Sequence, residues 1–325
     1  MSERVLTQGL STLGTTLVTI LGRIPGVAFV LVALFAIFAS MSPGFSTAPN
    51  LSNILVQSAI LLLLALPMTF IIMTEGLDLS IGAVLTLSSV VLALVALATG
   101  SLAVAFFAAL AIGLAFGLLN GWIIAWLDIP PFVTTLGTLG IAQGLSLVLT
   151  DGQSVVGMPP ALHYIYSGYL FGIPFPLVIA AVAYAAMHVI LYHTRLGTYV
   201  PALGGNREAL RHAGINDRLV LTVIYGIGGL MAGVAALLLT SRMSAAHPTA
   251  AIGMEFDAIA AVAVGGTQFE RGEGWLLGTL LGVITIGVLR NGLNLLEMPS
   301  SIQVICVGLL VIVALFLDGM RKVQE

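Results

Sequence analysis

The sequence predicts an all-α fold, a polytopic bundle of about ten membrane-crossing helices, some of them short or broken. Three observations lead to this prediction. Of the 325 residues, 59% are hydrophobic and only 8% are charged, whereas a soluble domain carries roughly 25% charged residues. The mean hydropathy is +1.12. Apolar runs such as Val84 to Ala98 are long and continuous, which favours helices over the alternating strands of a β-barrel.

The composition also limits what the chain can do. It excludes a water-soluble enzyme, a nucleic-acid-binding protein and a disordered chain, because so few charges cannot cover a soluble surface. The net charge of −3 does not favour binding to a polyanion. The single cysteine, Cys306, lies in an apolar run and can form neither an intrachain disulfide nor a multi-cysteine metal site. We therefore expect membrane lipid around the chain, no metal and no nucleic acid.

The apolar segments follow one another along the chain. The first, Ile24 to Met41, could pass for a signal sequence, but no clear small-residue cleavage site follows it, so we count it as a span. A shorter apolar piece lies at 258–266. The remaining segments approach the roughly 20 residues that a helix needs to cross the hydrocarbon layer. They occupy residues 53–73, 80–98, 102–126, 132–150, 172–192, 219–241, 275–290 and 301–317.

The arginines indicate the orientation. With Lys322, they gather near the N-terminus, between residues 195 and 218, and at the C-terminus, and the positive-inside rule places these regions in the cytoplasm. With both termini in the cytoplasm, the number of crossings has to be even, so the piece at 258–266 is expected to be a partial or tilted crossing. The same count places the tyrosine-rich loop 151–171 outside. We expect one transmembrane permease domain, 1–325, with a cytoplasmic segment 1–23 and a cytoplasmic loop 193–218.

The chain also repeats itself faintly. Asn120-Gly121 and Asn291-Gly292 each end a glycine-rich helix and precede an acidic residue and a proline. Duplicated halves are common in transporters. Chance similarity between glycine-rich helices explains the pattern equally well, so both interpretations stay open.

Catalytic motifs are missing from the sequence. A P-loop needs a lysine followed by Ser or Thr, and the only lysine, Lys322, precedes Val323. There is no His-Glu-x-x-His and no Gly-x-Ser-x-Gly, and the five histidines show no metal spacing. We therefore expect no enzyme and no cofactor on this chain.

Acidic residues between apolar runs are the first candidate site. Glu75 and Asp78 lie in the segment Thr74 to Gly82, where charge is costly and usually functional. Asp78 or Ser80 could cap the following helix, line a pathway, or carry a proton. Asp257 could cap another helix in the same way, and we expect Arg290 to snorkel toward an interface.

The charged stretch 193–218 is the second candidate. Asn206 is predicted to cap a short helix from Arg207 to Ala213, which Gly214 closes, with its arginines exposed. Taken alone, the stretch fits a solvated loop and a docking helix for a cytoplasmic partner about equally.

From about residue 26 onward the chain resembles the ribose-type permeases of bacterial ABC sugar importers. The resemblance is specific because several motifs occur in the same order. They are Gly76–Gly82, Ile129–Gly137, Thr194–Gly197, Gly204–Ala209, Ala213–Asn216, Glu255–Val262, Gly265–Thr267 and Asn291–Asn294.

The resemblance implies a division of labour. The chain is expected to be a multi-pass permease subunit in the bacterial inner membrane that translocates a pentose or hexose. A second permease subunit, in a homodimer rather than a heterodimer, completes the pathway. A separate cytoplasmic ATPase carries ATP and magnesium, and a periplasmic sugar-binding protein delivers the cargo.

The resemblance also assigns residues. Importer permeases carry a Glu-Ala-Ala-x-x-x-Gly coupling motif, which Glu208, Ala209 and Gly214 match and Leu210 departs from. The expected ATPase-coupling loop contains Gly205, Asn206, Arg207, Glu208, Ala209, Arg211, Gly214 and Asn216. The expected translocation pathway contains Asp78, Ser80, Asn120, Thr134 and Thr135.

Two alternatives to a sugar permease remain. Related permeases carry nucleosides, amino acids or furanone signals. An ion-coupled secondary transporter is the other alternative, which the carboxylates Glu75, Asp78 and Asp257 motivate.

Overall fold

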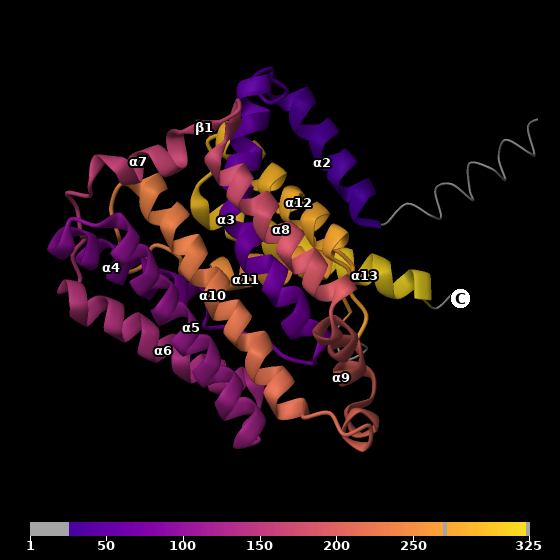
Figure 1. Cartoon of the computed structure of the whole chain (residues 1–325). Helices are drawn as coiled ribbons and strands as arrows, with labels where there is room; N and C mark the ends of the chain where they lie inside the picture. Colours follow the sequence, from indigo (N-terminus) through magenta and orange to yellow (C-terminus); the bar gives the residue numbers. More distant parts are fainter. Residues whose placement is uncertain (1–25, 269–271, 323–325) are drawn as a thin grey trace, which may run out of the picture.

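The computed structural model describes residues 26–268 and 272–322 (Figure 1). The predicted cytoplasmic segment 1–23 lies outside the described residues. The elements are α2 (Gly26–Met41), α3 (Ala48–Met73), α4 (Ile81–Thr99), α5 (Leu102–Trp126), α6 (Pro131–Thr150), α7 (Pro160–Ser167), β1 (Tyr169–Leu170), β2 (Ile173–Pro174), α8 (Phe175–His193), α9 (Arg195–His212), α10 (Asp217–Met243), α11 (Met254–Val264), α12 (Leu276–Leu295) and α13 (Ser300–Lys322).

The architecture is that of a helical membrane protein, as the sequence predicts. Seven described helices are long and apolar enough to cross a bilayer: α3, α4, α5, α6, α8, α10 and α12. The apolar parts of α2 and α13 that the structure describes are shorter. Most predicted segments match a helix to within a few residues, because a continuous apolar run of this length satisfies its backbone only as a helix.

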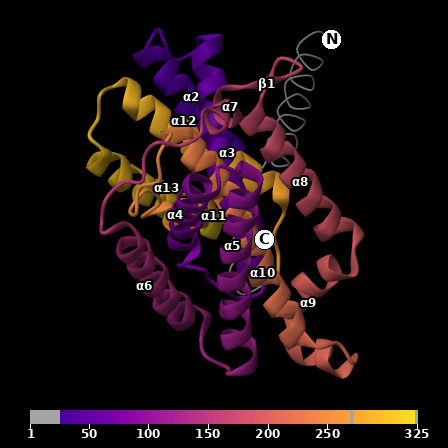
Figure 2. The same cartoon turned by 60° about the vertical axis from the view of Figure 1, so that its left-hand side comes forward.

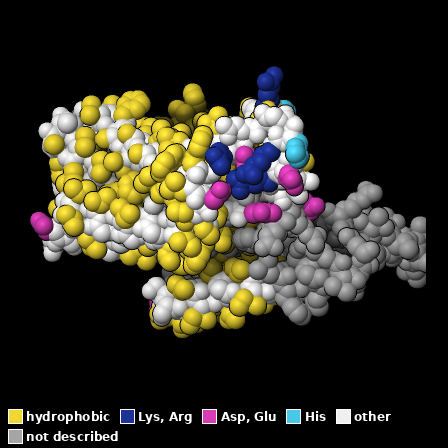
Figure 3. All heavy atoms as spheres, turned by 90° about the horizontal axis from the view of Figure 1, so that it is seen from below, with side chains coloured by type: hydrophobic (Ala, Val, Ile, Leu, Met, Phe, Trp, Pro, Cys, Tyr) yellow, Lys and Arg dark blue, Asp and Glu magenta, His cyan; other side chains and the backbone are white. Residues whose placement is uncertain are grey.

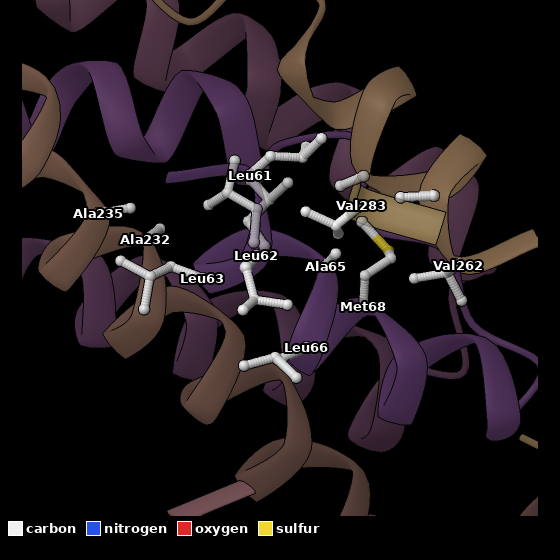
Figure 4. Close-up of a cluster of buried hydrophobic side chains, with 14 of the residues drawn as sticks. Leu61, Leu62, Leu63, Ala65, Leu66, Met68, Ala232, Ala235, Val262 and Val283 are labelled. Carbon is white, nitrogen blue, oxygen red and sulfur yellow. The ribbon is translucent and has the colours of Figure 1, made fainter. Parts of the chain in front are cut away.

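The centre of the bundle is α3. Its most apolar stretch is 89% buried, because other helices surround a helix that is hydrophobic on every side. Leu63, Leu64 and Leu66 have no exposed surface. Figure 4 shows this cluster, with Leu61, Leu62, Leu63, Ala65, Leu66 and Met68 of α3 among Ala232 and Ala235 of α10, Val262 of α11 and Val283 of α12.

Glycines bring α5 and α10 into direct backbone contact. A Cβ atom on Gly113 or Gly117 of α5 would collide with the backbone of α10, and one on Gly229 would collide with Gly113. Small residues allow this approach in membrane helices, where dispersion contacts replace the hydrophobic effect between helices. The glycine-rich pattern of α5 therefore serves helix packing.

Two helices begin inside the bundle after non-helical backbone. Residues 74–80 lead into α4, and residues 244–253 lead into α11. The backbone N–H of Ala251 lies 3.3 Å from Thr86 Oγ1 of α4, and the carboxyl group of Glu255 packs against Gly82. The N-terminal turns of α4 and α11 thus lie side by side. The predicted piece at 258–266 is the second half of such a broken segment.

The predicted outer loop 151–171 is ordered. It contains α7, and it leads into the antiparallel hairpin β1–β2. Val155 pairs with Ala246 in an isolated bridge, and Ser154 Oγ bonds to His247 Nδ1. These contacts hold the loop against the segment that leads into α11.

The glycine contact predicts unequal effects of two matched variants. Gly117→Ala should destabilise the chain by about 1–3 kcal/mol, since α5 and α10 must separate. Gly137→Ala is the control, because Gly137 lies on α6, at the edge of the bundle in Figure 2, with open space where a Cβ would be. It should be neutral or stabilising by up to about 1 kcal/mol. Thermal unfolding in detergent measures both, and equal shifts would contradict the packing role.

Candidate functional site

Asp78 lies at the break between α3 and α4. It is 2% exposed, and its Oδ1 accepts hydrogen bonds from the backbone N–H of Ser80 at 2.9 Å and from Ser80 Oγ at 2.6 Å. Of the two predicted capping residues, Asp78 therefore accepts from the backbone at the start of α4, and the side chain of Ser80 makes no cap bond.

The hydrogen bonds continue across three helices. Asn120 Nδ2 of α5 donates to Ser80 Oγ at 2.8 Å, and Thr138 Oγ1 of α6 donates to Asn120 Oδ1 at 2.7 Å. The structure thus brings Asp78, Ser80 and Asn120 together, as the sequence analysis grouped them. Thr138 joins them, and the sequence analysis missed it, although it lies one turn beyond Thr134 on the same helix.

The carbonyl of Leu77 closes the cluster. It accepts from Thr135 Oγ1 and from the hydroxyl of Tyr225, each at 3.3 Å. Tyr225 is fully buried on α10 and was also missed, since a lone aromatic residue in an apolar helix carries no sequence signal. We call Asp78, Ser80, Asn120, Thr135, Thr138 and Tyr225 the polar cluster. Thr134 is buried, but its hydroxyl has no hydrogen-bond partner among the described residues.

The polar cluster satisfies the irregular backbone where α3 gives way to α4. All six of its residues are buried in this conformation. Its bonds join α4, α5, α6 and α10. Their predicted role in lining the translocation pathway stays a prediction.

One expectation about α11 is wrong. Asp257 does not cap α11; both of its carboxylate oxygens accept from Arg290 Nη2, at 2.7 and 2.6 Å. The guanidinium of Arg290 thus has a buried partner on α11, and its predicted snorkelling stays a prediction. Glu255, which the sequence analysis passed over, is 4% exposed and accepts from the backbone N–H of Gly253 at 3.1 Å.

The predicted short cytoplasmic helix is confirmed as a helix. The backbone of α9 kinks at Asn206, where φ is −158° and ψ is 87°. Asn206 Oδ1 accepts from the N–H of Ala209 at 2.8 Å, which is an N-cap. Gly214, with φ +77°, follows the end of the helix. We call residues 205–216 the docking segment, after the role that the sequence analysis predicts for them.

The docking segment is tied to the next long helix. Asp217, the first residue of α10, accepts from Arg207 Nε at 2.6 Å and from Arg211 Nη2 at 2.9 Å. The hydrogen bond and the charge of Asp217 raise the pKa of the Arg211 guanidinium. Asn216 Oδ1 caps α10 through the N–H of Leu219 at 3.2 Å. The arginines are thus only partly free, whereas the expectation was simply that they are exposed.

Glu208 is the freest charge of the docking segment. Its side chain is 86% exposed, and the imidazole of His212 lies 3.8 Å away. Gly205 has open space around it, and Ala209 is exposed. Figure 3, which views the end of the molecule at the bottom of Figure 1, shows basic and acidic side chains gathered beside a broad hydrophobic surface. The docking segment therefore presents a small, rigid, charged surface.

The polar cluster predicts how Asp78 variants behave. Asp78→Asn keeps an Oδ1 acceptor for the N–H and hydroxyl of Ser80, so the unfolding temperature should stay near that of the native chain. Asp78→Leu strands both donors and should cost about 1–3 kcal/mol. Thermal unfolding of the purified chain tests this. A loss with Asp78→Asn as large as with Asp78→Leu would show that the charge itself is needed.

Known proteins resemble the chain over nearly its whole length. It is 38% identical over 296 residues to the ribose import permease protein RbsC of Escherichia coli (strain K12), with 90% of this chain and 92% of that protein covered. It is 36% identical over 295 residues to the D-allose transport system permease protein AlsC of the same strain, with 90% of each covered. It is 33% identical over 319 residues to the galactose/methyl galactoside import permease protein MglC, also from that strain, with 92% and 95% covered.

The family comparison agrees with these relatives. No solved structure matches the chain. Residues 50–315 match the family described as "Branched-chain amino acid transport system / permease component". Together with the seven long apolar helices, these matches identify a multi-pass protein of the bacterial inner membrane. The resemblance drawn from the sequence motifs is confirmed, and the chain belongs to this family of transport permeases.

Proposed function

We propose that the chain is the membrane-spanning permease subunit of an ATP-driven importer for a sugar of the pentose or hexose class. The observation that carries this proposal is the near full-length similarity to permeases named for ribose, allose and galactose. The missing P-loop supports it, because ATP and magnesium then bind a separate cytoplasmic ATPase. A periplasmic sugar-binding protein delivers the cargo.

The docking segment is the contact for the ATPase. Its short helix moves as a unit because Asn206 caps it and Asp217 holds two of its arginines. Asp217 begins α10, and α10 lies in backbone contact with α5. A displacement imposed on the docking segment by closure of the nucleotide-binding domains therefore passes directly into two long helices. Their movement alternates access between the two sides of the membrane.

The membrane topology has ten crossings. Nine are α2, α3, α4, α5, α6, α8, α10, α12 and α13, and the tenth is residues 244–264, which combine a non-helical segment with α11. Both termini are then cytoplasmic, on the same side as the docking segment, and the whole chain is one permease domain. Two copies of this chain form the transporter, and Asp78, Ser80, Asn120, Thr134 and Thr135 line the pathway when the helices move apart.

Amino acids are the main alternative cargo, because the family description names branched-chain amino acid transport. Nucleosides and furanone signals follow from the wider resemblance. An ion-coupled transporter is disfavoured, because both carboxylates already have partners. Asp78 accepts two hydrogen bonds from Ser80, and Asp257 pairs with Arg290.

Uptake by the reconstituted transporter tests the proposed function. The chain should take up D-ribose, D-allose or D-galactose into liposomes only with its ATPase, ATP and the sugar-loaded binding protein. Leucine and adenosine serve as the competing cargoes. Sugar uptake by the chain alone, driven by a proton or sodium gradient, would contradict the proposal, and uptake of leucine in place of sugars would change the cargo.

The docking assignment makes its own prediction. Glu208→Arg should leave the unfolding temperature unchanged, since Glu208 is exposed and weakly paired, and should weaken ATPase association about tenfold, as loss of one charged contact does. Glu297→Arg is the matched control, the same charge reversal at an exposed residue between α12 and α13. Co-purification of the ATPase with each variant measures the effect. Equal retention of the ATPase by both variants would remove the assignment.

A further inference from the structure

A cavity of about 660 Å³ lies between α11, α12 and α13, apart from the polar cluster. This volume falls within the roughly 300–1,000 Å³ typical of small-molecule sites. Ile259, Val304 and Val307 give it apolar walls, and Asp257 and Arg290 are the charged residues that line it. The cavity thus combines a hydrophobic wall with one carboxylate and one guanidinium.

The pairing of Asp257 and Arg290 leaves hydrogen-bonding capacity unused. A single nitrogen, Nη2, donates to both carboxylate oxygens, whereas a fork-to-fork pair uses two nitrogens. Among the described residues, Arg290 Nη1 has no hydrogen-bond partner and Nε is buried without one. The Arg290 side chain is 35% exposed. Beside a carboxylate that can accept more bonds, Nη1 is therefore the free donor of Arg290 that a ligand could reach.

Helix packing does not require this ion pair. α11 and α12 already meet through their backbones, because a Cβ on Gly265, Gly278 or Gly282 would collide with the facing helix. A charged pair away from bulk water is also costly and has to be compensated. The pair thus calls for an explanation other than holding α11 against α12.

The two opposite charges disfavour a ligand with a single charge. An anion meets Asp257 and a cation meets Arg290, so neither is favoured. A neutral polyhydroxylated molecule suits both, since each hydroxyl can donate to the carboxylate and accept from the guanidinium. An amino-acid zwitterion also matches the two charges, but the similarity to permeases named for ribose, allose and galactose favours the sugar. Its C–H faces suit the apolar wall.

We infer that this cavity is a binding subsite for a neutral monosaccharide within the permease, with Asp257 accepting from its hydroxyls and Arg290 donating to them. The inference rests on the proposed function and deepens it. It assigns to Asp257 and Arg290 a part in cargo recognition that is separate from the polar cluster and the docking segment.

Transport by charge variants is the first test. The complete transporter is reconstituted, and the sugar that the native complex takes up best among D-ribose, D-allose and D-galactose is the probe. Arg290→Met, which keeps the aliphatic stem, and Asp257→Asn should each lower sugar uptake about tenfold, with the amount of bound ATPase unchanged. The exchange Asp257→Arg with Arg290→Asp keeps an ion pair and should not restore uptake. Full recovery in the exchange variant would overturn the inference and leave a structural pair.

Cysteine protection is a second test that leaves both charges in place. Val304→Cys and Ile305→Cys, each in a Cys306→Ala chain, form a matched pair on α13. Val304 and Ile305 are 62% and 60% exposed, but only Val304 lines the cavity. The probe sugar should slow modification of Val304→Cys by a small thiol reagent severalfold and leave Ile305→Cys unaffected. Equal rates with and without sugar at Val304→Cys would overturn the inference.

The two failures can be told apart. If the native transporter takes up none of the three sugars, the proposed function fails and the subsite fails with it. If it takes up a sugar, but uptake persists in Arg290→Met or no protection occurs at Val304→Cys, the proposed function stands and the subsite alone is wrong.

Discussion

A chain in a lipid bilayer has to satisfy its backbone polar groups within the protein, and the rest of this structure depends on how it does so at its helix breaks. Each unpaired N–H or C=O group in hydrocarbon costs roughly several kcal/mol, so non-helical backbone is tolerated only where the protein itself surrounds it. At the break between α3 and α4, the carbonyl of Leu77 accepts from Thr135 and Tyr225, and the N–H of Ser80 donates to Asp78. Thr135 lies on α6 and Tyr225 on α10, whereas Asp78 lies within the break itself.

That constraint links local backbone to global packing. Because the partners of the break lie on α5, α6 and α10, those helices have to sit around it in one arrangement. The glycines of α5 and α10 allow the close approach that the arrangement needs. The same α10 begins at Asp217, which holds the docking segment. The docking segment is therefore directly connected to α10 and, through α10, to α5, as the proposed coupling to an ATPase requires.

Much of the fold could be predicted from the sequence, because a continuous apolar run has one stable form in a membrane. The positions of α3, α4, α5 and α10 follow from such runs to within a few residues. The cap on the docking segment was also predictable, since Asn206 bonds only three residues ahead. Thr138 and Tyr225 were not predictable, since their partners lie 18 and 148 residues away in the chain. Asp257 was mistaken for a cap because its local position resembles one, while its partner Arg290 lies 33 residues away.

The sequence by itself determined that the chain lies in a lipid bilayer, that it is helical, which family it resembles and where the short capped helix lies. All of these depend on composition, on the length of the apolar runs and on local spacing. Only the tertiary structure decided which buried polar groups meet, that Asp257 pairs with Arg290, and that a cavity opens beside them. The physical reason is that one apolar helix resembles another in sequence, and its polar residues gain their partners only when distant helices pack together.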